Sequence, residues 1–158
     1  MADHTYGKVA WEGHWAKLYG DGKLTWGPDP KLTDHGVMQA QQVHAALLER
    51  GDSLPRPTAF YSSPFTRALH TLHIEWDGLL PERPVLVMEE LRETIGKNTC
   101  DMRSTRSCIH ERFPNVALDI EEEDTLWSPV RETNDTMRVR IHTAMQRIWV
   151  DASKDRGG

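Results

Sequence analysis

The sequence predicts an α/β fold in which short strands alternate with amphipathic helices. Short apolar segments with the composition of buried strands are followed by longer segments whose apolar residues recur at helical spacing. The order strand, helix, strand, helix is that of a layered α/β fold. The 158 residues are 38% hydrophobic and 27% charged, with both signs mixed along the chain. We therefore expect one globular domain over residues 1–158.

The composition also argues against several classes of protein. The net charge is −5, and the sequence shows no basic stripe of the kind that nucleic-acid-binding proteins carry. It has no apolar run of 18 residues and no apolar N-terminal signal segment. We therefore expect a cytoplasmic chain without nucleic-acid or membrane partners. Cys100 and Cys108 are expected to be free thiols.

The first 51 residues are predicted to form a loop and a helix. Residues 6–30 are rich in Trp, Gly and Pro, which predicts a long loop anchored by aromatic side chains. Thr33 is a suitable N-cap, and apolar residues recur at helical spacing after it. Gly51 is a natural stop signal. The pattern predicts a helix over residues 31–50.

The middle of the chain is predicted to form a strand, a helix and a second strand. Residues 58–61 and 84–88 are short and apolar, so both are predicted to be buried strands. Between them, Ser63 before Pro64 is a helix-start signal, because proline fits the first helical position. This helix is expected to run from Pro64 to Trp76.

Two further helices are predicted in the last third of the chain. Residues 89–102 are expected to form a loop, followed by a short helix that Ser104 caps and that ends before Pro114. A longer helix is predicted over residues 134–150. The apolar residues expected to line one face of it are Met137, Ile141, Ala144, Met145 and Ile148.

Arg67 is a candidate phosphate-binding residue. It lies on the first turn of a predicted helix, directly after a predicted strand. Helix N-termini present free N–H groups and the positive end of the helix dipole, and a guanidinium adds a forked donor for phosphate oxygens. The alternative is an ordinary surface arginine.

Glu93 is a candidate general acid. It lies in segment 90–96 just after the second predicted strand, at the sheet end where open α/β folds bind ligands. A carboxyl group kept protonated there could donate its proton to a leaving alcohol. The alternative is that Arg92 and Glu93 are solvated loop charges.

Other charged segments are interpreted as structural. Arg103 and Arg106 are three residues apart and are expected to share a helix face, where Asp101 and Glu111 would pair with them. The acidic run 121–124 is interpreted as a solvated loop.

The eight histidines suggest no metal site. His70 and His73 stand at positions i and i+3, but no carboxylate or cysteine completes a familiar ligand pattern around them. We therefore predict no metal ion and no other cofactor. His44 and His142 are expected to be hydrogen-bonded residues of the core or its boundary.

Several segments together carry a family resemblance. Residues 63–71 match the pattern S-P-x-x-R-A-x-x-T, residues 91–96 an L-R-E segment, and residues 29–40 a D-P-x-L-T-x-x-G-x-x-Q-A helix entry. With these three motifs in order, the chain resembles the histidine phosphatases, which are phosphoglycerate-mutase-like proteins. The segments that resemble a mainly fungal branch of that family are 6–30, 99–107 and 122–127.

The resemblance implies a three-layer α/β histidine-phosphatase fold and hydrolysis of a phosphomonoester. In that family a histidine of an Arg-His-Gly motif attacks phosphorus. A second histidine and two arginines hold the phosphoryl group, and an acidic residue protonates the leaving oxygen. By position, Arg67 matches the second arginine and Glu93 the acid. The implied partner is a small phosphorylated substrate or another anionic small molecule.

The sequence departs from the family at both catalytic histidines. No Arg-His-Gly motif occurs, and the expected positions of the two histidine motifs fall just before Met1 and just after Gly158. We therefore expect an incomplete fold and a truncated or inactive member of the family. Two alternatives stay open. One is a non-catalytic binding module, such as a homodimer that covers its open strand edges, and the other is a repurposed enzyme in which His14 or His70 works with Glu93.

Overall fold

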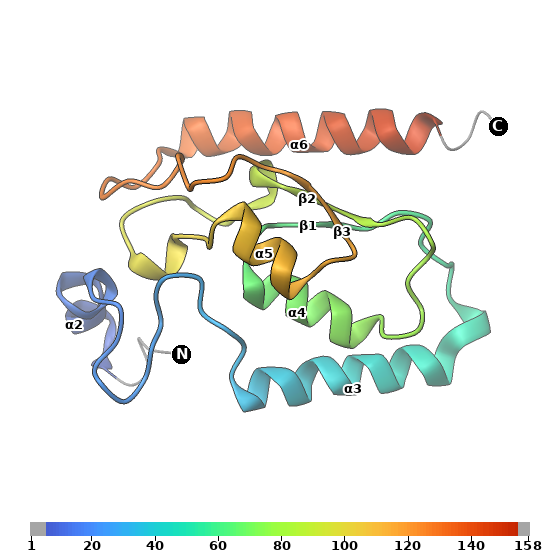
Figure 1. The fold of residues 1–158 in the computed structure, drawn as a ribbon, viewed down its shortest axis with the longest axis horizontal. Coiled ribbons are helices and arrows are strands. Elements are labelled where there is room, and N and C mark those ends of the chain that lie inside the picture. Colours follow the sequence, from blue (N-terminus) through green and yellow to red (C-terminus); the bar gives the residue numbers. More distant parts are fainter. Residues whose placement is uncertain (1–5, 155–158) are drawn as a thin grey trace.

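The computed structural model describes residues 6–154 and confirms an α/β fold with a small parallel sheet between helices (Figure 1). Its three strands, in the spatial order β1-β2-β3, are β1 (Tyr61–Ser62), β2 (Val85–Met88) and β3 (Val116–Asp119). Parallel strands bring their carboxyl ends to the same edge of the sheet. The segments that carry Arg67 and Glu93 therefore leave neighbouring strands on the same side.

The strand predictions hold in part. Residues 84–88 are confirmed as β2, which begins at Val85, whereas β1 begins only at Tyr61 and not at residue 58. The third strand, β3, was not predicted from the sequence. Its four residues follow the turn after Pro114 and are too few for a periodic pattern to appear.

Local capping explains where the helices begin. The helices within residues 6–154 are α2 (Lys8–Gly13), α3 (Asp34–Arg50), α4 (Thr66–Glu75), α5 (Arg106–Arg112) and α6 (Asn134–Lys154). Thr33 caps α3 as predicted, since its hydroxyl accepts a hydrogen bond from the Gly36 N–H at 3.1 Å. The predicted start of α4 at Pro64 is wrong, because Phe65 occupies the cap position and the helix begins at Thr66. Ser104 does not cap α5 either, because the neighbouring Thr105 accepts from the backbone.

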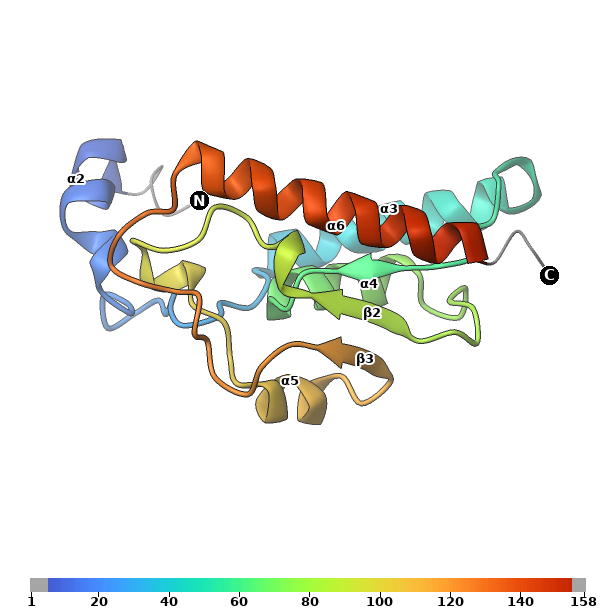
Figure 2. The same ribbon diagram turned by 90° about the horizontal axis from the view of Figure 1, so that it is seen from above.

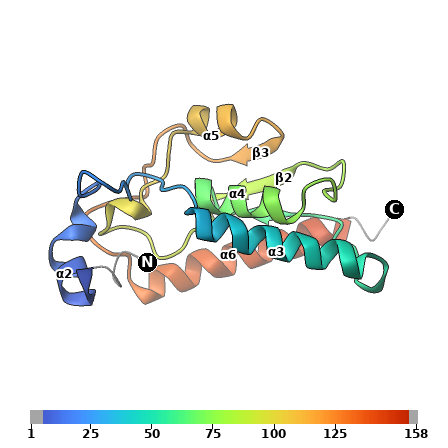
Figure 3. The ribbon, with the colours of Figure 1, turned by 90° about the horizontal axis from the view of Figure 1, so that it is seen from below.

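The core lies on one face of the sheet. Val85 and Val87 of β2 and Val116 of β3 pack against Leu69 of α4 and Ile109 of α5. Figure 2 shows α6 crossing the fold over the sheet and α5 beside β3. Figure 3, from the opposite side, shows α3 alongside α4, against which it packs. The short strands are thus held between two layers of helices.

The predicted apolar face of α6 is wrong for two residues. Ala144 is fully buried, but Ile141 and Met145 are 45% and 58% exposed. Instead, α6 is attached to the sheet loops by arginines. Arg140 donates hydrogen bonds to the loop after β2, and Arg147 pairs with carboxylates of that loop and of β3.

Residues 6–30 contain α2 and a 3-10 turn at Trp15–Lys17, so the prediction of an uninterrupted loop is wrong there. The predicted aromatic anchoring is confirmed, because the ring centroids of Trp11 and Trp26 lie 5.4 Å apart. None of the helices within residues 6–154 is long and apolar enough to cross a membrane.

Candidate functional site

One cavity, of about 760 Å³, brings together the two candidate site residues. Arg67 enters it from the first turn of α4 and Glu93 from the loop after β2. The segment before α3 and the aromatic segment 6–30 form its other walls. A second cavity, of about 800 Å³ and lying beyond the end of α3, contains neither candidate. We call the first one the Arg67 cavity.

Arg67 keeps hydrogen-bonding capacity for a ligand. Its Nη1 donates to the Cys100 carbonyl at 3.2 Å, and its Nη2 lies 3.8 Å from Glu93 Oε2. The guanidinium also lies over the Phe65 ring, 4.1 Å from the centroid, as a cation–π contact. Because a guanidinium has five N–H donors, several are left for an oxyanion. The side chain is 29% exposed, so a ligand can reach it.

The start of α4 is already occupied by a carboxylate. Asp29 accepts hydrogen bonds from the Thr66 N–H at 2.7 Å and from the Thr66 hydroxyl at 2.6 Å. Arg112 lies 3.2 Å from the same carboxylate. The expectation of free N–H groups at this helix start is therefore wrong for Thr66. The Thr66 N–H is therefore not available to a second anion, and the Arg67 side chain is the cation that this turn presents to the cavity.

Glu93 combines a fixed backbone with an accessible carboxyl group. Arg140 of α6 donates to the Glu93 carbonyl at 3.2 Å and to the Arg92 carbonyl at 2.8 Å. Arg140 is itself paired with Glu132. The Glu93 side chain is 80% exposed and points along the cavity wall toward Arg67. Its position is thus set by α6, which is distant in the sequence.

Arg131, a further cation that lines the Arg67 cavity, was not predicted from the sequence. Its Nη1 lies 2.6 Å from Asp101 Oδ2 and donates to the Thr94 carbonyl at 2.8 Å. The predicted pairing of Asp101 with a helical arginine is therefore wrong. Burial raises the pKa of Asp101 although Arg131 opposes the change. No spacing signal connects Arg131 to the other site residues, because it follows a long irregular segment.

Cys100 also lines the cavity, but its thiol is not activated. Burial, with a smaller contribution from the adjacent Asp101, raises its pKa to about 11. The thiol is therefore protonated at neutral pH, and the thiolate is the nucleophilic form of cysteine.

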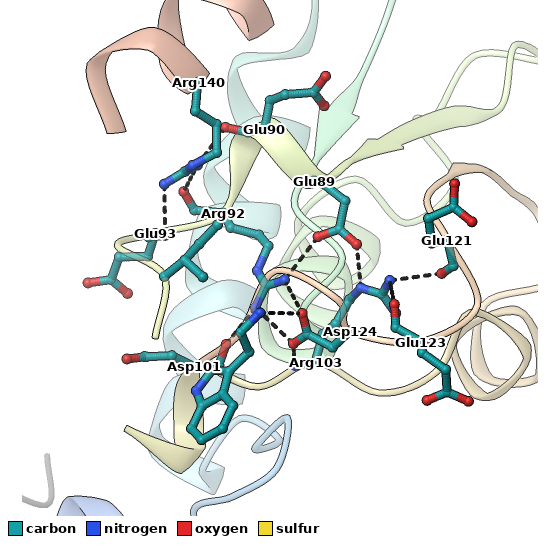
Figure 4. A network of polar contacts seen from close by, with 12 residues as sticks. Glu89, Glu90, Arg92, Glu93, Asp101, Arg103, Glu121, Glu123, Asp124 and Arg140 are labelled. Atoms are coloured by element: carbon teal, nitrogen blue, oxygen red, sulfur yellow. Dashed lines mark hydrogen bonds and ion pairs between the residues drawn. The ribbon is translucent and has the colours of Figure 1, made fainter. Parts of the chain in front are cut away.

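Arg92 lies beside the cavity in a buried network of charges (Figure 4). Its side chain is fully buried, so the reading of Arg92 as a solvated charge is wrong. It bonds both Asp124 oxygens, at 2.7 and 3.0 Å, and lies 3.0 Å from Glu89. Burial alone would raise the pKa of Asp124, but the hydrogen bonds from Arg92 and the Arg103 N–H outweigh it and lower the pKa.

Arg103 completes this network. Its side chain is fully buried and pairs with Glu89. Its terminal nitrogens donate to backbone carbonyls of Ser104, Glu121, Glu122 and Glu123. The prediction that Arg103 shares a helix face with Arg106 is wrong, since it precedes α5. The acidic run is likewise only partly solvated, because Arg103 binds its backbone and Asp124 points inward.

The histidines do not gather at the cavity. His44 and His73 lie 3.0 and 2.8 Å from backbone carbonyls, whereas His142 is exposed, against expectation. Neither His14 nor His70 lines the Arg67 cavity, so the pairing of either one with Glu93 is not found. Among residues 6–154, no three His, Cys, Asp or Glu side chains are arranged to hold a metal ion.

Comparison with known families and sequences adds independent information. The sequence model of the histidine phosphatase superfamily (branch 1) matches residues 8–156. A probable phosphoglycerate mutase of Arthroderma benhamiae is 35% identical over 157 residues, which are 94% of this chain and 47% of that protein. A phosphomutase-like protein of Candida albicans is 32% identical, over 99% of this chain and 50% of its own length. The chain spans about half the length of these two relatives.

A solved structure supports the fold assignment. The ecdysone phosphate phosphatase of Bombix mori, crystallised in complex with tungstate, is similar with a TM-score of 0.59 and 23% sequence identity. The similarity covers 97% of this chain and 64% of that one. At this level of identity the comparison concerns the arrangement of helices and strands.

Proposed function

Because this chain belongs to the histidine phosphatase superfamily (branch 1), we propose that the Arg67 cavity binds the phosphoryl group of a phosphomonoester for hydrolysis. The observation that carries the proposal is the meeting of Arg67 and Glu93, 3.8 Å apart at the wall of one cavity. A cation for the phosphoryl oxygens and an acid for the leaving oxygen are both required by that reaction.

In this proposal Arg67 holds the phosphoryl group and Glu93 protonates the leaving oxygen. The free donors of Arg67 suit two oxygens of a tetrahedral anion. The Glu93 carboxyl lies on the open side of the cavity, where the ester oxygen would emerge.

The names of the similar proteins support a phosphorylated ligand. The two fungal relatives carry mutase names, and the Bombix mori protein is a phosphatase whose structure holds tungstate, a tetrahedral oxyanion like phosphate. These descriptions agree with the cation at the wall of the Arg67 cavity.

A second candidate function is phosphoester binding without turnover. Among the described residues that line the cavity there is no histidine to carry the phosphoryl group, and the Cys100 thiol is protonated at neutral pH. The cavity would then bind a phosphorylated small molecule as a ligand.

Calorimetry with inorganic phosphate tests the shared part of both candidates. We expect saturable binding that Arg67→Ala weakens at least about tenfold, which corresponds to loss of a charge-assisted bidentate contact. Arg106→Ala, which changes an exposed arginine of α5, is the control and should leave the affinity unchanged. Unchanged affinity in Arg67→Ala would reject the proposed site.

Hydrolysis of p-nitrophenyl phosphate separates the two candidates. No turnover above background in the 158-residue chain, with or without Arg67→Ala, would favour phosphoester binding without turnover. Turnover that Arg67→Ala abolishes would show that a residue other than the family's histidine carries out the covalent step.

A further inference from the structure

We propose that the Arg67 cavity selects phosphomonoesters whose alcohol is a flat, apolar ring system. The inference rests on the proposed function, because it takes the phosphoryl group to be at Arg67. It concerns the apolar side chains that line the same cavity, which are Trp11, Leu24, Trp26 and Leu32.

The cavity is lined by charged and by apolar side chains. Lys31, Arg67, Glu93 and Arg131 bring charge, whereas the apolar wall is formed by Trp11, Leu24, Trp26 and Leu32. Its volume of about 760 Å³ is that of a pocket for a drug-sized ligand and far exceeds a phosphoryl group. A phosphoryl group at Arg67 therefore leaves most of the cavity to the alcohol, which meets mainly apolar side chains.

The apolar wall is built on aromatic rings that pack against one another. Trp26 is 7% exposed, and its Nε1 donates to the carbonyls of Trp15 at 3.1 Å and Leu18 at 2.8 Å. The Trp11 ring packs edge-on against Trp26. Tyr6, which also lines the cavity, stacks on Trp15, with ring centroids 4.6 Å apart. Because these rings hold one another in place, a ligand binding to Trp11 need not order them first.

Part of the apolar wall is open to a ligand. Leu24 is 59% exposed yet lines the cavity, and Trp11 and Leu32 are half-buried there. A single exposed leucine is unremarkable, but Leu24 lines the same concave site as Trp11. A flat ring would cover both residues and gain aromatic contact with Trp11, whereas a polyhydroxy alcohol would lose hydrogen bonds to water there.

Three phosphonates, which cannot be hydrolysed, test the inference by calorimetry on the 158-residue chain. They are methylphosphonate, 2-hydroxyethylphosphonate and 1-naphthylmethylphosphonate. We expect the naphthyl compound to bind at least about tenfold more tightly than the other two, because it buries its ring. Equal affinities would overturn the inference and leave the proposed function standing.

Substitutions in the apolar wall test whether its side chains cause the preference for the naphthyl compound. Trp11→Ala should remove most of the naphthyl preference and leave the methylphosphonate affinity within about twofold. Leu24→Asn, at an exposed position where folding is not at risk, should reduce the preference severalfold. Trp15→Phe is the matched control, since Trp15 is one of the packed aromatic rings but does not line the cavity, and it should keep the preference. A preference that survives both Trp11→Ala and Leu24→Asn would contradict the inference.

Arg67→Ala separates failure of the inference from failure of the proposed function. We expect it to weaken all three phosphonates by a similar factor. If it leaves all three unchanged, the phosphoryl group does not bind at Arg67, and both proposals fail.

Discussion

The Arg67 cavity and the network around Arg92 place two arginines in opposite surroundings, although both guanidinium groups face the Phe65 ring, at 4.1 and 5.2 Å. Arg92 is fully buried, and its two terminal nitrogens make four hydrogen bonds, three of them to carboxylates. Arg67 is partly exposed and makes one hydrogen bond to a carbonyl.

The difference shows what separates a structural arginine from one that is available to a ligand. Both terminal nitrogens of Arg92 are occupied in joining the loop after β2 to the acidic segment that precedes α6. The Arg67 donors are held in place by a ring and a carbonyl, and most of them stay unused. The two arginines should therefore respond to substitution in opposite ways, in stability for one and in binding for the other.

Arg92→Met should have the largest effect, a loss of about 3–5 kcal/mol in the free energy of unfolding. The substitution leaves Asp124 buried without its cation, while Glu89 keeps only its ion pair with Arg103. Urea denaturation measures the change. Arg138→Met is the control, because that arginine is 79% exposed, and it should change stability by less than about 0.5 kcal/mol. A cost below 1 kcal/mol for Arg92→Met would end the distinction between the two regions.

The second-largest effect should come from acid, which weakens the buried charge network around Arg92. Because the pKa of Asp124 is lowered in the folded chain, its stabilisation is fully present above its unfolded pKa of about 4 and is lost as the pH falls further. The raised pKa of Asp101 acts in the opposite direction. Asp124→Asn should cost about 1.5–3 kcal/mol at pH 7 and flatten the loss of stability below pH 4. Urea denaturation across pH 2–7 checks this, and parallel pH curves for both proteins would argue against it.

Arg67→Ala should cost at most about 1 kcal/mol of stability, because the residue makes one neutral hydrogen bond and one ion pair to an exposed carboxylate. The same substitution should abolish most of the phosphate binding. On one preparation, urea denaturation gives the free energy of unfolding and calorimetry gives the phosphate affinity. A stability loss as large as that of Arg92→Met would place Arg67 among the structural arginines.

Glu93→Gln should have the smallest effect. The carboxyl is 80% exposed, and Arg140 holds its backbone through the carbonyl, so stability should change by less than about 0.5 kcal/mol. Phosphate should bind a fewfold more tightly, since a negative charge beside Arg67 is removed. Calorimetry measures the shift. Weaker phosphate binding would mean that the Glu93 carboxylate helps to orient Arg67, in addition to facing the leaving group.

Local signals predicted the parts of the fold whose cause is local. The cap at Thr33, the helix after it and the strand at residues 84–88 follow from side-chain chemistry and periodicity within a few residues. The start of α4 was predicted two residues early, because the actual partner of its first turn is Asp29, 37 residues upstream. A cap from so far along the chain leaves no local pattern.

The sequence by itself determined the α/β class, the family and the places of Arg67 and Glu93 along the chain, since these depend on periodicity, on motif order and on the shared edge of parallel strands. Only the tertiary structure decided which arginines are free. Arg67, Arg92, Arg103 and Arg131 have the same side chain, and their roles follow from burial and from partners up to 37 residues away. A guanidinium binds whatever carboxylates and carbonyls folding brings to it. Its availability to a ligand is therefore a property of the packed chain.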